Sequence, residues 1–362
     1  MESIPIRTLM RPNISSLVPY SSARNEFAGE GHIFLDANES YNSFVSGAKR
    51  NRYPDPNHQK LKEKLASHLQ VDQQHIVIGN GSDELIDLLF RIFCEPQKDK
   101  ALLISPTYGA YQVFADINNV DVSHCQLGDD YTINLRKMEA VCELVGKGTV
   151  EMGMHKLLFI CSPNNPTGNA FPLEQLEVII KKFKGITVID EAYIEYSDKE
   201  SVISLLQENE RLVILRTFSK AWALADVRVG YALAHPAVIR AMHQVKYPYN
   251  LSGVAQELAI EALEKKDEVY QAIQETKKER SRVASELKNL SFVERVFPSD
   301  ANFLLLRMID PDGIYEQLKE RGIIVRNRSF QRGCYGCIRI TIGSKEENDA
   351  LLEALKEMEN AT

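Results

Sequence analysis

Short apolar runs alternate with longer segments of helical periodicity along most of the chain, and this alternation limits the possible folds more than any other feature. The runs are rich in β-branched residues, as strands are when both of their faces are buried. Between them, apolar residues recur at helical spacing. We therefore predict an α/β fold with a mostly parallel central sheet and helices on both faces. The predicted strands are residues 75–78, 101–104, 120–124, 156–160, 186–189 and 213–215.

The C-terminal third has a different pattern. A long, charged, amphipathic helix is predicted over residues 254–290, followed by short strands and two helices. Because 362 residues exceed a comfortable single core, we expect a large domain at 46–250 and a smaller α+β domain at 251–362. Residues 1–45 are predicted to form an N-terminal arm and a first strand at 33–36. Such an arm packs on the small domain or on a partner subunit.

The charge balance and the cysteines exclude several classes of protein. With 43 basic and 50 acidic residues the net charge is -7, which argues against a nucleic-acid surface. No apolar run approaches the ~20 residues of a membrane span. Six scattered cysteines and the lack of an apolar signal segment predict reduced thiols and a cytoplasmic location. The dispersed histidines form no HExxH pattern, so we expect no metal site.

Lys220 follows the last predicted strand, in a segment with few other charges. A lysine at the rim of a sheet, desolvated and close to a second cation such as Arg228, shifts toward the neutral amine that a nucleophile requires. Arg228 and Ser219 could hold a phosphate through charge-assisted hydrogen bonds. A nucleophilic lysine beside a phosphate site suggests pyridoxal phosphate. An ordinary loop lysine is the alternative.

Asp190 closes the preceding apolar strand, where a carboxylate is costly to bury without a cationic partner. The N–H of a pyridinium ring is one such partner. The carboxylate would keep the ring nitrogen protonated, so that the ring acts as an electron sink. The alternatives are a salt bridge to a neighbouring arginine and a magnesium site, although the chain has no P-loop motif to support the metal.

The segment 79–84 leads from the first predicted strand into a helix and contains Gly81, Ser82 and Asp83. Free N–H groups at the start of a helix attract phosphate, and a glycine lets the phosphate approach the backbone closely. Alternatively, Ser82 or Asp83 only caps the helix.

Three further side chains follow or interrupt predicted strands. Tyr108 could stack on a planar ring, or it could be an ordinary buried tyrosine. Asn165, in the turn-rich segment 162–168, could offer its amide to a cofactor hydroxyl or could simply complete a turn. Arg339 lies inside an apolar strand, where it must meet an anion, either a substrate or an interior aspartate.

Together these segments resemble the fold-type I pyridoxal-phosphate aminotransferases, and more closely the histidinol-phosphate aminotransferases, over about residues 14–355. The resemblance depends on the order of the motifs and on their positions at strand ends. The motifs are LDANES at 35–40, RYPDP at 52–56, GNGSDE at 79–84, PTY at 106–108, CSPNNPTG at 161–168, DEAY at 190–193, TFSK at 217–220, RVGY at 228–231, VRNRS at 325–329, ANF at 301–303 and IRIT at 338–341.

The resemblance implies roles for individual residues. Lys220 would form the Schiff base with pyridoxal phosphate, Asp190 would pair with the pyridine nitrogen, and Tyr193 would join Asn165 at the phenolic oxygen. Tyr53 would reach the phosphate from the other subunit of a homodimer with active sites at its interface. The residues implied to bind the cofactor are Tyr53, Gly81, Ser82, Asp83, Tyr108, Asn165, Asp190, Tyr193, Ser219, Lys220 and Arg228. Those implied to bind substrate are Tyr20, Asn38, Arg326 and Arg339.

The chain departs from the family pattern after the lysine, where Ala223 and Asp226 replace common glycines. The Asp226 carboxylate, two residues before Arg228, could compete with the cofactor phosphate.

The activity implied by the resemblance is transfer of the amino group of L-histidinol phosphate to 2-oxoglutarate in histidine biosynthesis, giving imidazole acetol phosphate and L-glutamate. A phosphate dianion gains from two guanidinium groups, which Arg326 and Arg339 would supply. Three alternatives are an aminotransferase for aromatic or other amino acids, a pyridoxal-phosphate-dependent decarboxylase of phosphorylated substrates, and a binding protein that keeps the fold without the chemistry.

Overall fold

The computed structural model describes residues 5–18, 33–145 and 154–360. Its larger sheet has the strand order β1-β7-β6-β5-β4-β2-β3. Only β7 runs antiparallel to its neighbours in this sheet, and the other pairings are parallel. The mostly parallel sheet is thus confirmed. The strands are β1 (Ile76–Asn80), β2 (Lys100–Ser105), β3 (Asp121–Gln126), β4 (His155–Cys161), β5 (Ile186–Asp190), β6 (Leu212–Thr217) and β7 (Val229–Ala234).

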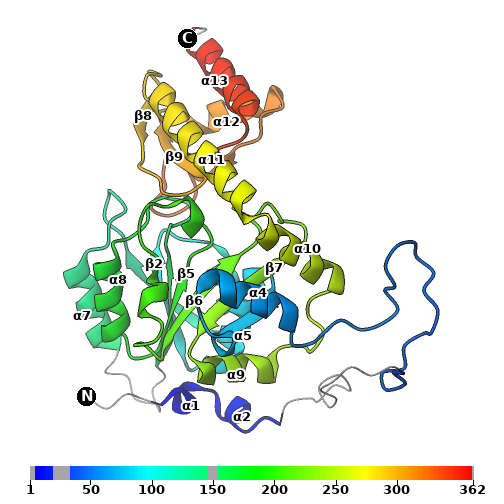
Figure 1. Ribbon diagram of the computed structural model, residues 1–362. Coiled ribbons are helices and arrows are strands. Elements are labelled where there is room, and N and C mark those ends of the chain that lie inside the picture. Colours follow the sequence, from blue (N-terminus) through cyan, green and yellow to red (C-terminus); the bar gives the residue numbers. More distant parts are fainter. Residues whose placement is uncertain (1–4, 19–32, 146–153, 361–362) are drawn as a thin grey trace.

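Helices cover both faces of this sheet, as predicted (Figure 1). Successive strand residues point to opposite faces, so Ile76 and Ile78 of β1 join one core and Val77 joins the other. The first core is completed by α4 (Gln59–Leu69), α7 (Leu135–Val145), α8 (Leu173–Lys182) and α10 (Gly253–Glu264). The second is completed by α5 (Gly81–Phe93), α6 (Ala110–Ile117) and α9 (Pro236–Val245).

The C-terminal part forms a second, antiparallel sheet with the order β10-β11-β9-β8. Helices contribute to an apolar core on one of its faces, and α11 connects this part to the large sheet's layers (Figure 1). The elements are α11 (Lys266–Leu287), β8 (Val293–Val296), β9 (Phe303–Met308), α12 (Pro311–Glu320), β10 (Arg326–Asn327), β11 (Cys337–Thr341) and α13 (Lys345–Asn360).

The prediction of a single helix over residues 254–290 is wrong in one respect, because two helices form. The segment is divided into α10 and α11 at Lys265, whose φ of -95° and ψ of 22° leave the α-helical conformation. The division lets α10 pack on the large sheet while α11 reaches the small domain.

The strand predicted at residues 33–36 does not form. Ile33 and Leu35 are 80% and 90% exposed, and no described strand lies beside them to complete a ladder. Before this segment, α1 (Ile6–Leu9) and α2 (Pro12–Ser15) dock beneath α9 (Figure 1). Short 3₁₀ turns complete the secondary structure: η1 (Gln73–His75), η2 (Ile194–Tyr196) and η3 (Val202–Leu205).

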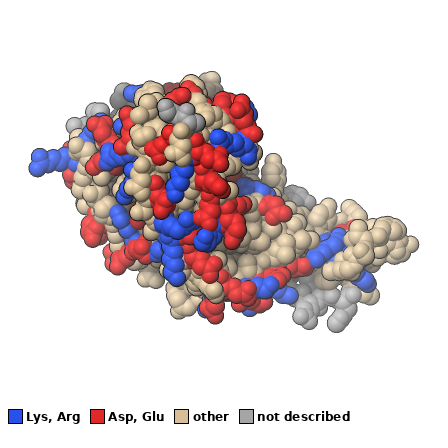
Figure 2. Space-filling view, turned by 90° about the horizontal axis from the view of Figure 1, so that it is seen from above, with Lys and Arg blue, Asp and Glu red and all other residues tan. Residues whose placement is uncertain are grey.

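The surface carries mixed charge. In the view of Figure 2, basic and acidic side chains are interspersed over the body, and a protruding arm has a largely uncharged tip. Among the described residues, no helix is both long and apolar enough to cross a membrane.

Candidate active site

Side chains from both domains meet where the parallel strands of the large sheet end. Asn165 follows β4, Tyr193 follows β5, and Lys220 follows β6. The Lys220 Nζ lies 5.7 Å from the centroid of the Tyr193 ring. From the small domain, Arg339 of β11 donates a 2.5 Å hydrogen bond to Asn165 Oδ1. The structure therefore brings together a lysine, an amide, a phenol and an arginine that are distant in sequence.

Lys220 sits in a turn that is fixed by hydrogen bonds on both sides. Ser219 N–H donates to the Thr217 hydroxyl at 3.1 Å, and Ala223 N–H donates to the Lys220 carbonyl at 3.1 Å. The surrounding protein displaces water from the amine, and Arg339 and Arg228 add positive charge. These effects lower the pKa of Lys220, although Asp83 and Asp190 oppose them. A lowered pKa favours the neutral amine, as a nucleophile requires.

Asp190 is buried and makes no ion pair with any described residue. The arginine that could have paired with it, Arg216 on the adjacent strand β6, is held by Glu191 at 2.8 Å in a buried salt bridge. Burial raises the pKa of Asp190 to about 6, while hydrogen bonds from Tyr111 and Ala192 lower it. A buried carboxylate without a protein cation suits a cationic ligand group such as a pyridinium N–H.

The start of α5 and the Arg228 segment form a candidate anion site. The Gly81 N–H donates to the Arg228 carbonyl at 2.6 Å, and a Cβ on Gly81 would lie 2.6 Å from Arg228 Nη2. Gly81 has a φ of +72°. The helix has no side-chain cap, so the capping alternative for Ser82 and Asp83 is wrong. Arg228 Nη1 lies 3.2 Å from Ser219 Oγ.

The two departures from the family pattern have different consequences. Ala223 adopts a φ of 55°, in the left-handed region that glycine populates readily, so the backbone keeps the form that a glycine would favour. Asp226 has no contact with Arg228 among the described residues. The carboxylate that contacts Arg228 is instead Asp83, with Oδ2 3.3 Å from Nη2. Asp83 also accepts a hydrogen bond from Tyr108 at 3.3 Å.

Asn165 connects the tyrosine to the arginine. Its Nδ2 donates to the Tyr193 hydroxyl at 3.5 Å, while its Oδ1 accepts from Arg339. Burial raises the pKa of Tyr193, so the phenol stays protonated in this site. Arg339 makes no ion pair with a described residue, and its Nε is buried without a hydrogen-bond partner. The interior-aspartate alternative for Arg339 is therefore wrong.

A second arginine lies directly opposite Arg339. Arg326 of β10 and Arg339 of β11 are register partners in the antiparallel pair, so their side chains leave the same face of the sheet. Leu305, paired with Arg339, packs on this face against Tyr131 of the large domain. Arg328, two residues after Arg326, has a buried Nε that finds no hydrogen-bond partner among the residues that the structure describes. Burial and then Arg339 and Arg326 lower the pKa of Arg328. The three guanidinium groups thus lie near one another, but only Arg339 contacts Asn165, and the exposed Arg326 lines a separate surface cavity with Asp312 and Tyr315 of α12.

Two of the predicted residues that the structure describes do not join this cluster. Tyr53 is half exposed and stacks on Tyr249, with ring centroids 4.4 Å apart. Asn38 lines another cavity together with Tyr53 and Arg52. Tyr20 lies outside the described residues.

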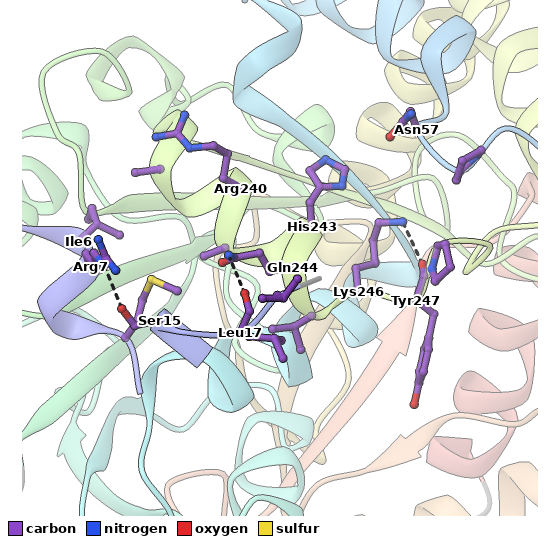
Figure 3. A pocket seen from close by; sticks show the side chains of 17 residues that line it. Ile6, Arg7, Ser15, Leu17, Asn57, Arg240, His243, Gln244, Lys246 and Tyr247 are labelled. Atoms are coloured by element: carbon purple, nitrogen blue, oxygen red, sulfur yellow. Dashed lines mark hydrogen bonds between the residues drawn. The ribbon is translucent and has the colours of Figure 1, made fainter. Parts of the chain in front are cut away.

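A cavity of about 1220 Å³ lies away from the lysine, between the N-terminal helices and α9. Figure 3 shows Arg240, His243 and Gln244 on α9, with Arg7 and Leu17 from the N-terminal segment. None of the predicted site residues that the structure describes lines this cavity.

Sequence reasoning missed two features of the site. It did not predict β7, although the apolar run begins directly after Arg228. It also did not single out Tyr111, which donates a 2.6 Å hydrogen bond to Asp190. The available signal was the position of Tyr111 at the start of α6, three residues after Tyr108. This spacing lets the Tyr111 side chain point toward the sheet.

The residues present fit pyridoxal phosphate. A nucleophilic lysine could bind its aldehyde, the unpaired Asp190 could meet its ring nitrogen, and the crowded glycine with Arg228 and Ser219 could receive its phosphate. The amide of Asn165 and the hydroxyl of Tyr193 are placed to reach a ring oxygen.

Comparisons with known proteins agree with this chemistry. The aminotransferase class I and II family matches residues 23–355. A histidinol-phosphate aminotransferase of Christiangramia forsetii is 43% identical over 362 residues, covering 99% of this chain and 100% of the relative. The structure of the histidinol-phosphate aminotransferase from Clostridium acetobutylicum superposes with a TM-score of 0.78 at 26% identity, covering 86% of this chain and 92% of that one. The structure of the histidinol-phosphate aminotransferase from Sinorhizobium meliloti, in complex with pyridoxal-5'-phosphate, superposes with a TM-score of 0.75 at 25% identity. The superposition covers 86% of this chain and 83% of that one.

Proposed function

Because this chain belongs to the class I and II aminotransferases, and among them to the histidinol-phosphate aminotransferases, we propose that it transfers the amino group of L-histidinol phosphate to 2-oxoglutarate. The products are imidazole acetol phosphate and L-glutamate, in a step of histidine biosynthesis. The observation that carries the choice of substrate is the register pairing of Arg326 with Arg339, because Arg339 is close enough to Lys220 to help lower its pKa.

Pyridoxal phosphate is the proposed cofactor, and when bound it supplies an aldehyde and an electron-withdrawing ring. Lys220 would hold the aldehyde carbon. Asp190 would hold the ring nitrogen, and Asn165 with Tyr193 would orient the ring oxygen. Tyr108 would cover one side of the ring, and the phosphate would lie against Gly81, Ser82, Asp83, Ser219 and Arg228. When the phosphate binds, the Asp83 carboxylate must either move away from the Arg228 guanidinium group or share that group with the phosphate.

Lys220 also serves as the proton carrier of the proposed reaction. Its lowered pKa leaves part of the amine neutral, so Nζ can accept a proton from the substrate carbon and return it to another carbon. Tyr193 lies beside this amine and stays a hydrogen-bond donor, because burial keeps its hydroxyl protonated.

The arginines explain how one site could take two different substrates, a phosphate and a dicarboxylate, in turn. A carboxylate is matched by one guanidinium group, which Arg339 provides while Asn165 orients it. A phosphate dianion carries more charge and more acceptor oxygens, so it also gains from Arg326. Arg328 adds a third positive charge close to both.

Arg326→Ala should raise the KM for histidinol phosphate roughly tenfold or more, because a charge-assisted hydrogen bond is lost. The KM for glutamate in the reverse half-reaction should change much less. Steady-state rates with each substrate measure this difference in KM. Rates of the wild type with phenylalanine as the donor separate the proposed enzyme from an aromatic aminotransferase. Arg321→Ala, which removes a surface arginine paired with Glu357, is the control. Equal weakening of both substrates by Arg326→Ala would show that Arg326 is not a phosphate contact.

A homodimer is proposed from the exposed arm. Tyr41 and Phe44 are 86% and 88% exposed in the segment that extends away from the body (Figures 1 and 2). Exposed aromatic side chains of this kind indicate a partner surface. In such a dimer Tyr53 would complete the cofactor site of the other subunit.

Sedimentation of the purified protein should give twice the 41.0 kDa chain mass. Replacing Tyr41 and Phe44 together with serine should shift the population toward single chains at low concentration, because apolar contacts are lost. A wild-type protein that sediments as one chain at all concentrations would refute the dimer.

Two further assignments are part of this proposal. The boundary between the large domain at 46–250 and the small domain at 251–362 is supported by the separate apolar core of the small sheet. The cytoplasmic location is supported by six cysteines that are all free and buried.

A further inference from the structure

Tyr111 lies behind the carboxylate that would hold the cofactor ring. Its side chain is fully buried, and its hydroxyl donates a 2.6 Å hydrogen bond to Asp190 Oδ2. The other oxygen, Asp190 Oδ1, accepts from the Ala192 N–H at 3.1 Å. The carboxylate is therefore held at both oxygens by neutral donors.

The ring of Tyr111 is fixed by its neighbours. It stacks on Phe159 of β4 with ring centroids 4.8 Å apart and an interplanar angle of 24°. Tyr108 meets it edge-on at 5.4 Å and 90°. Because the ring is held on two sides, the hydroxyl has one direction in which to point, and Asp190 lies there. Tyr111 comes from α6 and Asp190 from β5, so this bond also connects a helix to the sheet edge.

The hydrogen bond from Tyr111 lowers the pKa of Asp190 against the opposing effects of its surroundings. Burial and the nearby carboxylates Asp83 and Glu191 disfavour the charged form of Asp190. The hydrogen bonds from Tyr111 and Ala192 favour it. The titratable groups that face Asp190 are Asp83 on α5, Tyr108 and Tyr111 at α6, Cys161 at the end of β4, Glu191 and Tyr193 after β5, and Lys220 after β6.

We propose that Tyr111 is a positioning residue, which aims the Asp190 carboxylate at the ring nitrogen of the cofactor and keeps that carboxylate ionised. The residue touches neither cofactor nor substrate and acts through Asp190. This inference rests on the proposed function, because it assigns Asp190 to the ring nitrogen.

The test is the pH dependence of pyridoxal phosphate binding to the full chain, measured by fluorescence titration for wild type and Tyr111→Phe. Binding should weaken below about pH 6 in the wild type, as Asp190 becomes protonated. Removing the donor raises the pKa of Asp190, so in the variant binding should weaken at a pH higher by about one unit. In the loaded enzyme, kcat should fall roughly tenfold while KM changes little.

Tyr131→Phe is the matched control, because it removes the same buried hydroxyl from a different cluster, where it donates to the Gly333 carbonyl at 3.0 Å. Tyr131→Phe should leave the pH dependence of cofactor binding unchanged. In an Asp190→Asn background, Tyr111→Phe should cause no further shift, because asparagine does not titrate. A Tyr111→Phe profile that matches the wild type would overturn the inference, as would a further shift in the asparagine background.

Failure of the proposed function is distinguishable from failure of this inference. If the wild type does not bind pyridoxal phosphate at any pH, the proposed function fails. If the wild type binds and only the shift is absent, Tyr111 alone has been misassigned. Should Tyr111→Phe not fold, fluorotyrosine placed at position 111 provides a stronger donor of nearly the same shape. It should move the profile to lower pH, and an unmoved profile would contradict the proposal.

Discussion

Lys220→Ala should give a folded protein that has lost nearly all amino transfer and no longer binds pyridoxal phosphate covalently. Lys220 is the only lysine that the described structure places beside Asn165, Tyr193 and Arg339, and its pKa is lowered toward the neutral amine. Without that amine, both the covalent attachment and the proton carrier are missing. We expect turnover to fall by a factor on the order of 10⁵ or more, since nucleophile and general base are removed together.

Absorbance and mass spectrometry measure this result. After borohydride reduction, the wild type should gain the mass of the cofactor on the peptide that contains Lys220, and the variant should not. Lys199→Ala is the control, because the Lys199 amine is held by the Ala170 carbonyl away from the site. If Lys220→Ala still gains the cofactor on a single other lysine and retains turnover, the wrong lysine has been assigned.

Asp190→Ala should lower kcat on the order of 10³-fold, with a much smaller change in the KM for histidinol phosphate. The carboxylate is buried at the end of β5 and has no cationic partner in the described part of the chain. Its proposed role is to hold the ring nitrogen protonated, which matters most when charge develops in the transition state. The loss should therefore appear in turnover rather than in substrate binding.

Asp226→Asn is the matched control for this experiment. Its carboxylate is exposed and close to Arg228 in sequence, but it makes no described contact with that arginine. The steady-state kcat and KM of both variants show whether the loss of turnover is specific to Asp190. Near-normal turnover for Asp190→Ala would contradict the electron-sink role, and a large loss for Asp226→Asn would show that Asp226 serves the phosphate site after all.

The parallel sheet and most of the site could be predicted because the relevant signals are local. Apolar runs mark buried strands, and the polar residues that follow them lie at one edge of a parallel sheet. Lys220, Asp190 and Asn165 were identified this way. The structure adds the contacts that these residues make, such as the hydrogen bond from Arg339 to Asn165 across the two domains.

The features that sequence reasoning missed depend on long-range packing. The strand at residues 33–36 had a suitable pattern, but a strand needs a neighbour, and none is present among the described elements. Nothing in the local pattern around Tyr111 shows that its hydroxyl reaches Asp190, 79 residues away in sequence. The pairing of Arg216 with Glu191 rather than with Asp190 likewise depends on which neighbour the fold places closer.

The most direct test of the central claim is an absorbance titration of the purified protein, loaded with pyridoxal phosphate, against L-histidinol phosphate. The absorbance of the lysine-bound cofactor should convert to that of the aminated cofactor, and 2-oxoglutarate should restore it with release of glutamate. If histidinol phosphate leaves the spectrum unchanged while another amino donor converts it, the proposed substrate is wrong. If no donor converts it, the chain is not an aminotransferase.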